Sequence, residues 1–113
     1  MSVSARDLLQ HMLDEAEYLE RESKDLQKHE FLEDETLRRA FVRSLEIIGE
    51  AAKKLPLNVR EEISGIEWRA ITGMRDRLIH GYFGVDYELV WDVVTQKVPE
   101  LRATLRSSLR DQD

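Results

Sequence analysis

The sequence lacks cysteine, has only two prolines and five glycines, and contains no uninterrupted run of more than three apolar residues. Without cysteine, the chain can form neither a disulfide framework nor a zinc site with thiolate ligands, and nothing indicates an oxidising compartment. The short apolar runs exclude a membrane-spanning helix, which needs about 20 apolar residues. The first ten residues also carry Arg6 and Asp7 and lack the apolar core of a signal peptide. We therefore expect a cytoplasmic protein without membrane contact.

The chain has no net positive charge with which to attract a nucleic acid, because its formal charge at pH 7 is −6. A field of this sign repels phosphate and argues against a protein that binds nucleic acid over its whole surface. It does not exclude a local basic cleft. Acidic and basic residues are mixed along the sequence, so most of them are expected to lie on solvated helix surfaces.

The length of 113 residues and the 42% hydrophobic content are typical of one domain with one modest core, which we assign to residues 1–113. A chain of this size buries only about two-thirds of its unfolded surface. Any additional apolar face is then a candidate for burial against a second subunit, and we expect oligomers.

Apolar residues recur at steps of three and four, which predicts amphipathic helices. The first helix is expected to begin at Ser4, a capping residue, and to end near Gln27. A polar stretch follows over residues 28–33. The second helix is expected to begin at Asp34, where acidic residues favour a helix N-terminus, and to end before Pro56.

Residues 56–66 are interpreted as a connector with at most one short helical turn around residues 59–63. Trp68 is expected to open a third helix, which should end near Gly81 or Gly84 because glycine is a poor helix interior and a good C-terminal stop.

Asp86 can cap a fourth helix, and Pro99 must then either kink it or start a fifth. No alternating strand pattern is present. The fold class predicted from the sequence is all-α, a four- or five-helix antiparallel bundle.

Arg75 is the first candidate functional residue. On a wheel of the third helix the apolar residues form one arc, made of Ile71, Met74, Leu78, Ile79 and Tyr82. Arg75 falls inside this arc. A guanidinium group in such a place is expected to be paired or to face a cleft or a ligand, because it cannot lose its charge.

Asp76 and His80 are four residues apart and would therefore lie on one side of a continuous helix. A carboxylate in that position can hydrogen-bond an imidazole, fix its tautomer and raise its basicity, which gives an acid–base arrangement. An ordinary surface pair is the alternative interpretation of the same spacing.

Arg75, His80 and Tyr82 together form the pattern Arg-x4-His-x-Tyr. The flanking sequence contains further blocks, which are LEIIGEAAKKL at 45–55, GMRD at 73–76, IHGYFGVD at 79–86 and VWD at 90–92. With these blocks the chain resembles HEPN domains of the HepT kind over roughly residues 5 to 110. The resemblance implies an antiparallel bundle that forms a two-fold homodimer, with both copies of the motif at one shared cleft.

In that family the motif is taken as a metal-independent ribonuclease site. The resemblance thus implies that His80 is the general acid–base group, supported by Asp76, and that Arg75 binds phosphate. The chemistry is consistent, because an imidazole with a pKa of ~6.5 suits proton transfer. A planar guanidinium can bind two phosphate oxygens at once. No carboxylate cluster or phosphate loop is present at the required spacing, so we expect neither a metal nor a cofactor.

The resemblance also implies a partner, a minimal nucleotidyltransferase (MNT) antitoxin that adds AMP to the tyrosine of the motif, here Tyr82. The chain would then be the toxin of a type VII HEPN/MNT toxin–antitoxin pair, with RNA as its substrate. Tyr82 could equally be an amphipathic packing residue.

Two other function classes fit the same helices. The chain could be a non-catalytic nucleotide- or substrate-binding subunit of a nucleotidyltransferase, or a purely structural dimer. Arg102, Arg106 and Arg110 form a stripe at helical spacing. These arginines could contact RNA, or they could simply interact favourably with the negative end of the helix dipole near the C-terminus of the last helix. Trp68 and Trp91 could stack on a base, although core or interface packing is favoured for both.

Overall fold

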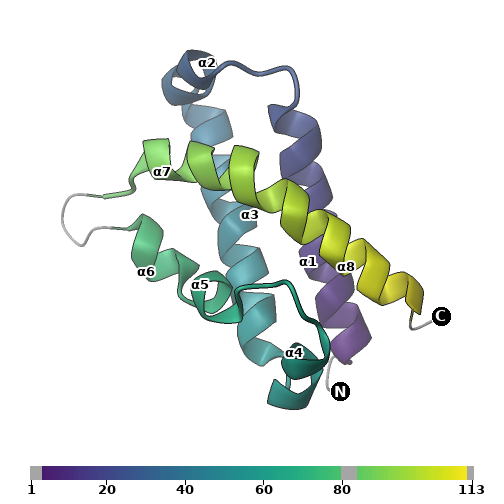
Figure 1. Cartoon of the computed structure of the whole chain (residues 1–113). Coiled ribbons are helices and arrows are strands. Elements are labelled where there is room, and N and C mark those ends of the chain that lie inside the picture. The colour runs from purple at the N-terminus through teal and green to yellow at the C-terminus, as the bar shows by residue number, and fades with distance from the viewer. Residues whose placement is uncertain (1–3, 80–83, 112–113) are drawn as a thin grey trace.

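The computed structural model describes residues 4–79 and 84–111. Within these ranges the chain is helical between short connections and contains no strand, which confirms the predicted all-α class. The helices are α1 (Ala5–Ser23), α2 (Lys28–Glu33), α3 (Glu35–Lys54), α4 (Leu57–Glu62), α5 (Trp68–Thr72), α6 (Met74–Leu78), α7 (Tyr87–Asp92), the π-helical turn η2 (Val93–Lys97) and α8 (Val98–Asp111) (Figure 1).

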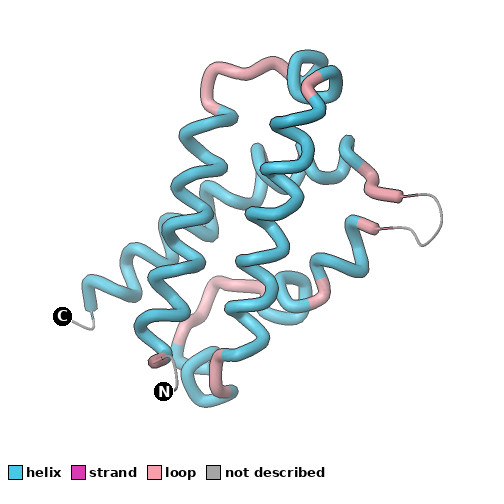
Figure 2. Tube along the Cα trace, turned by 180° about the vertical axis from the view of Figure 1, so that it is seen from behind, coloured by secondary structure: helices cyan, strands magenta, loops and turns pink. Residues whose placement is uncertain are grey.

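The core lies between the three long helices. Helices α1 and α3 run antiparallel and side by side, and the helical run from α7 to α8 crosses them (Figures 1 and 2). Each long helix turns one apolar stripe inward, as the three- and four-residue periodicity predicts. Fully buried members of this core include Leu9, Leu19, Phe41, Ile48 and Leu105. Burial of each such side chain contributes about 1.5–3 kcal/mol, so the central contacts of α1 with α3 and α8 hold the bundle together.

Three predicted helix starts are confirmed by their capping bonds. The Ser4 hydroxyl accepts the Asp7 N–H at 3.1 Å and opens α1. The carboxylate of Asp34 accepts the Leu37 N–H at 3.0 Å at the start of α3, and that of Asp86 accepts the Leu89 N–H at 3.1 Å at the start of α7. Each bond satisfies an N–H that the helix itself leaves without a partner.

The interpretation of residues 28–33 as a non-helical polar stretch was wrong. Helix α1 ends at Ser23, and the chain forms α2 over these residues. The Gln27 N–H donates to the Glu30 carboxylate at 2.8 Å at the beginning of α2. Phe31 is completely buried and stacks on Phe41 with 5.0 Å between ring centroids. The burial of Phe31 therefore stabilises a helix in an otherwise polar segment.

The predicted third helix is broken in two. Gly73, with φ −92° and ψ 7°, separates α5 from α6, and α6 ends at Leu78 instead of continuing to Gly81. A Cβ atom on Gly73 would lie only 3.2 Å from the carbonyl oxygen of Arg69. Helix α4 begins at Leu57, so it is longer than the single turn predicted near residues 59–63.

Pro99 is the second residue of α8, which follows the π-helical η2 directly. The chain is helical without a break from Tyr87 to Asp111, and the turn just before Pro99 is the π-helical η2. Its last bond joins the Val98 N–H to the Val93 carbonyl, five residues back. Because proline lacks an N–H and its ring crowds the carbonyl four residues before it, a widened turn lets the helix pass Pro99.

None of the helices in residues 4–79 and 84–111 combines the length and the apolar content that a membrane crossing requires.

Candidate functional site

The motif segment is held by a short antiparallel neck between α6 and α7. Ile79 leaves α6 in an extended conformation, with φ −111° and ψ 123°, and forms an isolated antiparallel bridge with Val85. The Asp86 N–H donates to the Leu78 carbonyl at 2.9 Å. In Figure 1 the C-terminal end of α6 and the beginning of α7 accordingly lie close together at one side of the bundle. The described residues on the two sides of the motif segment are therefore joined to each other.

His80 and Tyr82 belong to the segment that this neck encloses, and both lie outside the described residues. Two features fix the path of the chain between Gly84 and the start of α7. Gly84 has φ +83°, a left-handed conformation that favours glycine. Asp86 supplies the backbone bond of the neck and its carboxylate caps α7, so the neck is continuous with a helix start.

Arg75 is exposed on α6, as are Asp76 and Arg77. The predicted apolar arc around Arg75 does not form as one helix face, because Ile71 lies on α5 and Ile79 is extended, and Arg75 is exposed. Only Met74 and Leu78 of α6 are buried. None of the ion pairs found among the described residues includes Arg75, so its guanidinium faces solvent on the helix that enters the neck.

Asp76 was expected to share one helix side with His80. The helical spacing behind this expectation does not hold, because α6 ends at Leu78 and Ile79 is extended. Asp76 is exposed, two residues before the end of α6. Its pairing with His80 stays a prediction.

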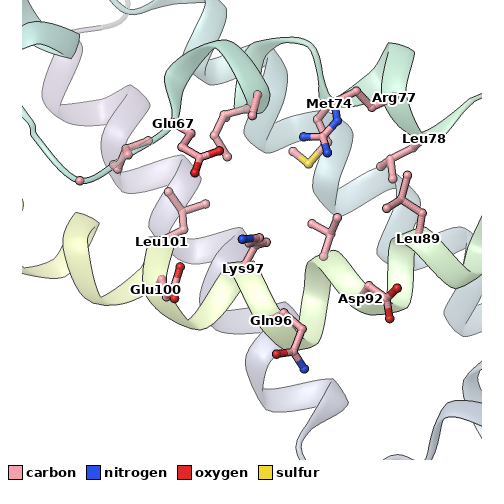
Figure 3. A pocket seen from close by; sticks show the side chains of 15 residues that line it. Glu67, Met74, Arg77, Leu78, Leu89, Asp92, Gln96, Lys97, Glu100 and Leu101 are labelled. Atoms are coloured by element: carbon pink, nitrogen blue, oxygen red, sulfur yellow. The ribbon is translucent and has the colours of Figure 1, made fainter.

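A groove of about 490 Å³ lies on the other side of α6, between α5–α6 and the run from α7 to α8. Apolar side chains, among them Met74, Leu78 and Leu101, line its floor. Charged residues of both signs stand along its walls, with Arg77 on α6 facing Asp92 and Lys97 across the groove (Figure 3). This mixture of signs makes the groove a poor phosphate site. No local sequence pattern predicts this groove, because the segments that line it come together only in the fold.

Two of the three C-terminal arginines are engaged within the fold. Arg102 donates to the Glu20 carboxylate at 2.5 Å, and Arg106 pairs with Glu17, so both tie α8 to α1. This pairing favours a structural role for these two residues. Arg110 is exposed.

Both tryptophans pack within the fold, as favoured from the sequence. The Trp68 indole N–H donates to the Ile63 carbonyl at 3.3 Å. The Trp91 ring lies 5.4 Å from that of Phe31. The described residues contain no group of three or more histidine, aspartate or glutamate side chains placed to hold a metal ion.

Comparison with known proteins gives a consistent result along the chain. The family model described as "Ribonuclease HepT-like" matches residues 12–108. A protein of Caldanaerobacter subterraneus subsp. tengcongensis, named "Putative RNase", is 47% identical over 105 residues, which cover 93% of this chain and 94% of that protein. A protein of Methanocaldococcus jannaschii with the same designation is 38% identical over 109 residues, which cover 94% of this chain and 90% of that protein.

A further relative, named "Probable ribonuclease HepT", comes from Thermococcus cleftensis and is 37% identical over 102 residues, which cover 90% of this chain and 93% of that protein. No solved structure matches the chain. The family match spans most of the sequence and includes α6, the neck and α7. The chain therefore belongs to the family of HepT-like ribonucleases.

Proposed function

We propose that the chain is the toxin of a type VII HEPN/MNT toxin–antitoxin pair and that it cleaves RNA without a metal ion. The observation that supports this best is the neck at Ile79 and Val85. The neck joins the two ends of the segment that contains His80. Arg75 is exposed on the helix that leads into it and forms no ion pair with the other described residues. Because both ends of the motif segment are fixed at the neck, its side chains are expected to return to the same positions, which catalysis on a single phosphate requires.

The proposed reaction is attack by a ribose 2′-hydroxyl on its own 3′-phosphate. His80 accepts the proton of the 2′-hydroxyl as the new O–P bond forms, and protonated imidazole gives a proton to the 5′-oxygen as the old P–O bond breaks. Arg75 stabilises the charge on the phosphate oxygens through its planar fork. Asp76 orients the imidazole. The products are a 2′,3′-cyclic phosphate and a free 5′-hydroxyl.

The proposed assembly is a two-fold homodimer with both motifs at one cleft. The small size of the chain supports it, since such a chain leaves much of its surface to be covered. The exposed position of Arg75 also supports it, because an exposed side chain can face a cleft that forms only between two copies.

The proposed regulation is transfer of AMP to Tyr82 by a minimal nucleotidyltransferase antitoxin. The phenol oxygen attacks the α-phosphorus of ATP, an O–P bond forms, and pyrophosphate leaves. Intact-mass spectrometry after co-expression tests this step, with an expected gain of one or more AMP units and loss of cleavage. Added mass that persists in Tyr82→Phe contradicts Tyr82 as the acceptor.

The runner-up function is a non-catalytic nucleotide- or substrate-binding subunit. The apolar groove beside Arg77, with about 490 Å³ of space, favours it because its volume is that of a small-molecule site, and the mixed charges of its lining favour a substrate without phosphate over a nucleotide. The two functions separate when purified protein is incubated with RNA in the presence of EDTA. Cleavage by the wild type that is absent in His80→Ala supports the ribonuclease. Nucleotide binding without RNA cleavage supports the subunit.

A further inference from the structure

Arg38 lies beside the neck, although the motif does not include it. It belongs to the first turns of α3, and its guanidinium carbon is 4.8 Å from the ring centroid of Tyr87, the first residue of α7. Tyr87 directly follows Asp86, whose N–H closes the neck on Leu78. The upper part of α3 accordingly lies next to the start of α7 (Figure 1). A cation is thus stacked on the first residue of the helix that follows the neck.

The guanidinium of Arg38 is incompletely satisfied. Its Nε atom is buried and has no hydrogen-bond partner in the described part of the chain. None of the ion pairs among the described residues includes Arg38. A buried donor without an acceptor costs about 1–3 kcal/mol. Arginine cannot avoid this cost by losing its proton. An acceptor from outside the chain would bond to the terminal nitrogens of the guanidinium, which are not buried without a partner as Nε is.

Neighbouring cations are already paired. Arg39, the next residue of α3, is 2.8 Å from the Glu35 carboxylate. Arg43, one turn farther on, is 3.9 Å from Glu50. Lys28 of α2 pairs at 3.6 Å with Glu88, the residue after Tyr87. Of the two carboxylates within four residues of Arg38, Glu35 pairs with Arg39 and Asp34 caps α3. Among the described residues, Arg38 differs from these three neighbouring cations in that no carboxylate pairs with it.

We propose that Arg38 is a second phosphate-binding residue of the ribonuclease site and holds the RNA backbone next to the phosphate that is cut. This inference rests on the proposed ribonuclease function. Stacking on Tyr87 limits the orientations of the guanidinium, so its fork is presented to a phosphate with little loss of side-chain freedom. In a chain with a net charge of −6, RNA binding must come from a few such local cations.

The test measures RNA binding apart from cleavage. A labelled single-stranded RNA is titrated at several salt concentrations with the His80→Ala protein, alone and combined with Arg38→Met. Methionine keeps an apolar stem over Tyr87 and removes only the charge and the donors. Affinity should fall about tenfold at low salt, equivalent to about 1.4 kcal/mol. The plot of log K against log salt should become less steep, with the magnitude of its negative slope reduced by about 0.7, the value for one phosphate contact on a single strand.

Arg39→Met is the matched control, because it removes the same charge from the adjacent position of α3. It should leave affinity and slope unchanged. Arg38→Lys should keep the slope and recover part of the affinity, since it restores the charge but not the fork. Thermal unfolding of each variant identifies any general loss of structure, which would weaken binding without changing the slope.

An unchanged slope in Arg38→Met, or an equal decrease in Arg39→Met, overturns the inference. Cleavage by the wild type is measured in parallel to separate the two proposals. Cleavage combined with an unchanged slope in Arg38→Met overturns the role of Arg38 and leaves the ribonuclease intact. A decreased slope without any wild-type cleavage supports phosphate binding by Arg38 and contradicts the ribonuclease.

Discussion

Arg75 and His80 are proposed to act within one chemical step, on one phosphate. The Arg75 side chain is exposed and has no ion-pair partner among the described residues, so its substitution removes no ion pair among them. Substitution of an exposed side chain of this kind usually changes stability by less than about 0.5 kcal/mol. Activity and stability can therefore be separated at this position.

His80→Ala and Arg75→Ala should each abolish RNA cleavage while the helical circular dichroism spectrum is preserved. Loss of the acid–base group alone should reduce the rate by about 10² to 10⁴. The double variant should be little worse than either single one, because the two residues work as a unit. Arg69→Ala, at an exposed arginine of α5, is the matched control and should cut RNA normally. Normal cleavage by either motif variant contradicts the assigned roles.

At the scale of elements, the neck between α6 and α7 is the feature that links fold and activity. Its geometry depends on Gly84, whose φ of +83° strains any L residue with a Cβ. No atom lies within 4 Å of a Cβ built there, so the cost of a substitution comes from the backbone and not from a clash.

Gly84→Ala should therefore lower the free energy of unfolding by about 1 kcal/mol and should also reduce cleavage. Gly65→Ala is the matched control, since Gly65 has φ +89° in the connection between α4 and α5, outside the neck. It should lose similar stability in urea unfolding and keep its activity. Equal cleavage by the two variants would show that the neck does not position the site. Gly84→Asn should be milder, because asparagine tolerates this conformation better.

Local signals predicted the helix starts well. Ser4, Asp34 and Asp86 each cap a helix as expected, because a side chain and an N–H only three residues apart determine the bond. Helix α2 depends on tertiary contacts, such as Phe31 against Phe41, and no local pattern contains them. The break falls at Gly73, but a glycine inside an apolar period lowers helix stability without always ending the helix. The apolar arc expected around Arg75 assumed an unbroken helix and failed for that reason.

At the scale of the molecule, the all-α class could be predicted because the apolar periodicity runs along almost the whole chain. The groove between α6 and the run from α7 to α8 could not, since its walls are brought together only by packing. The position of Arg38 against Tyr87 has the same origin, because α3 and α7 are far apart in sequence.

The proposed two-fold dimer predicts a mass twice that of the 13.3 kDa chain. Light scattering or sedimentation should find this mass at micromolar concentration, because the cleft between two copies is required for the proposed mechanism. A monodisperse monomer under these conditions would remove the shared cleft. Cleavage by such a monomer would show that one copy of the motif suffices.

The central claim is that RNA is cut by its own 2′-hydroxyl through Arg75 and His80, without a metal ion. The most direct measurement uses an RNA whose cut site has been mapped with the wild-type protein, and a matched strand with one 2′-deoxy sugar at that site. In EDTA, the all-ribose strand should yield a product that ends in 2′,3′-cyclic phosphate, and the deoxy strand should resist at that position. Cleavage of the deoxy strand at the same rate, or cleavage abolished by EDTA, would contradict the account.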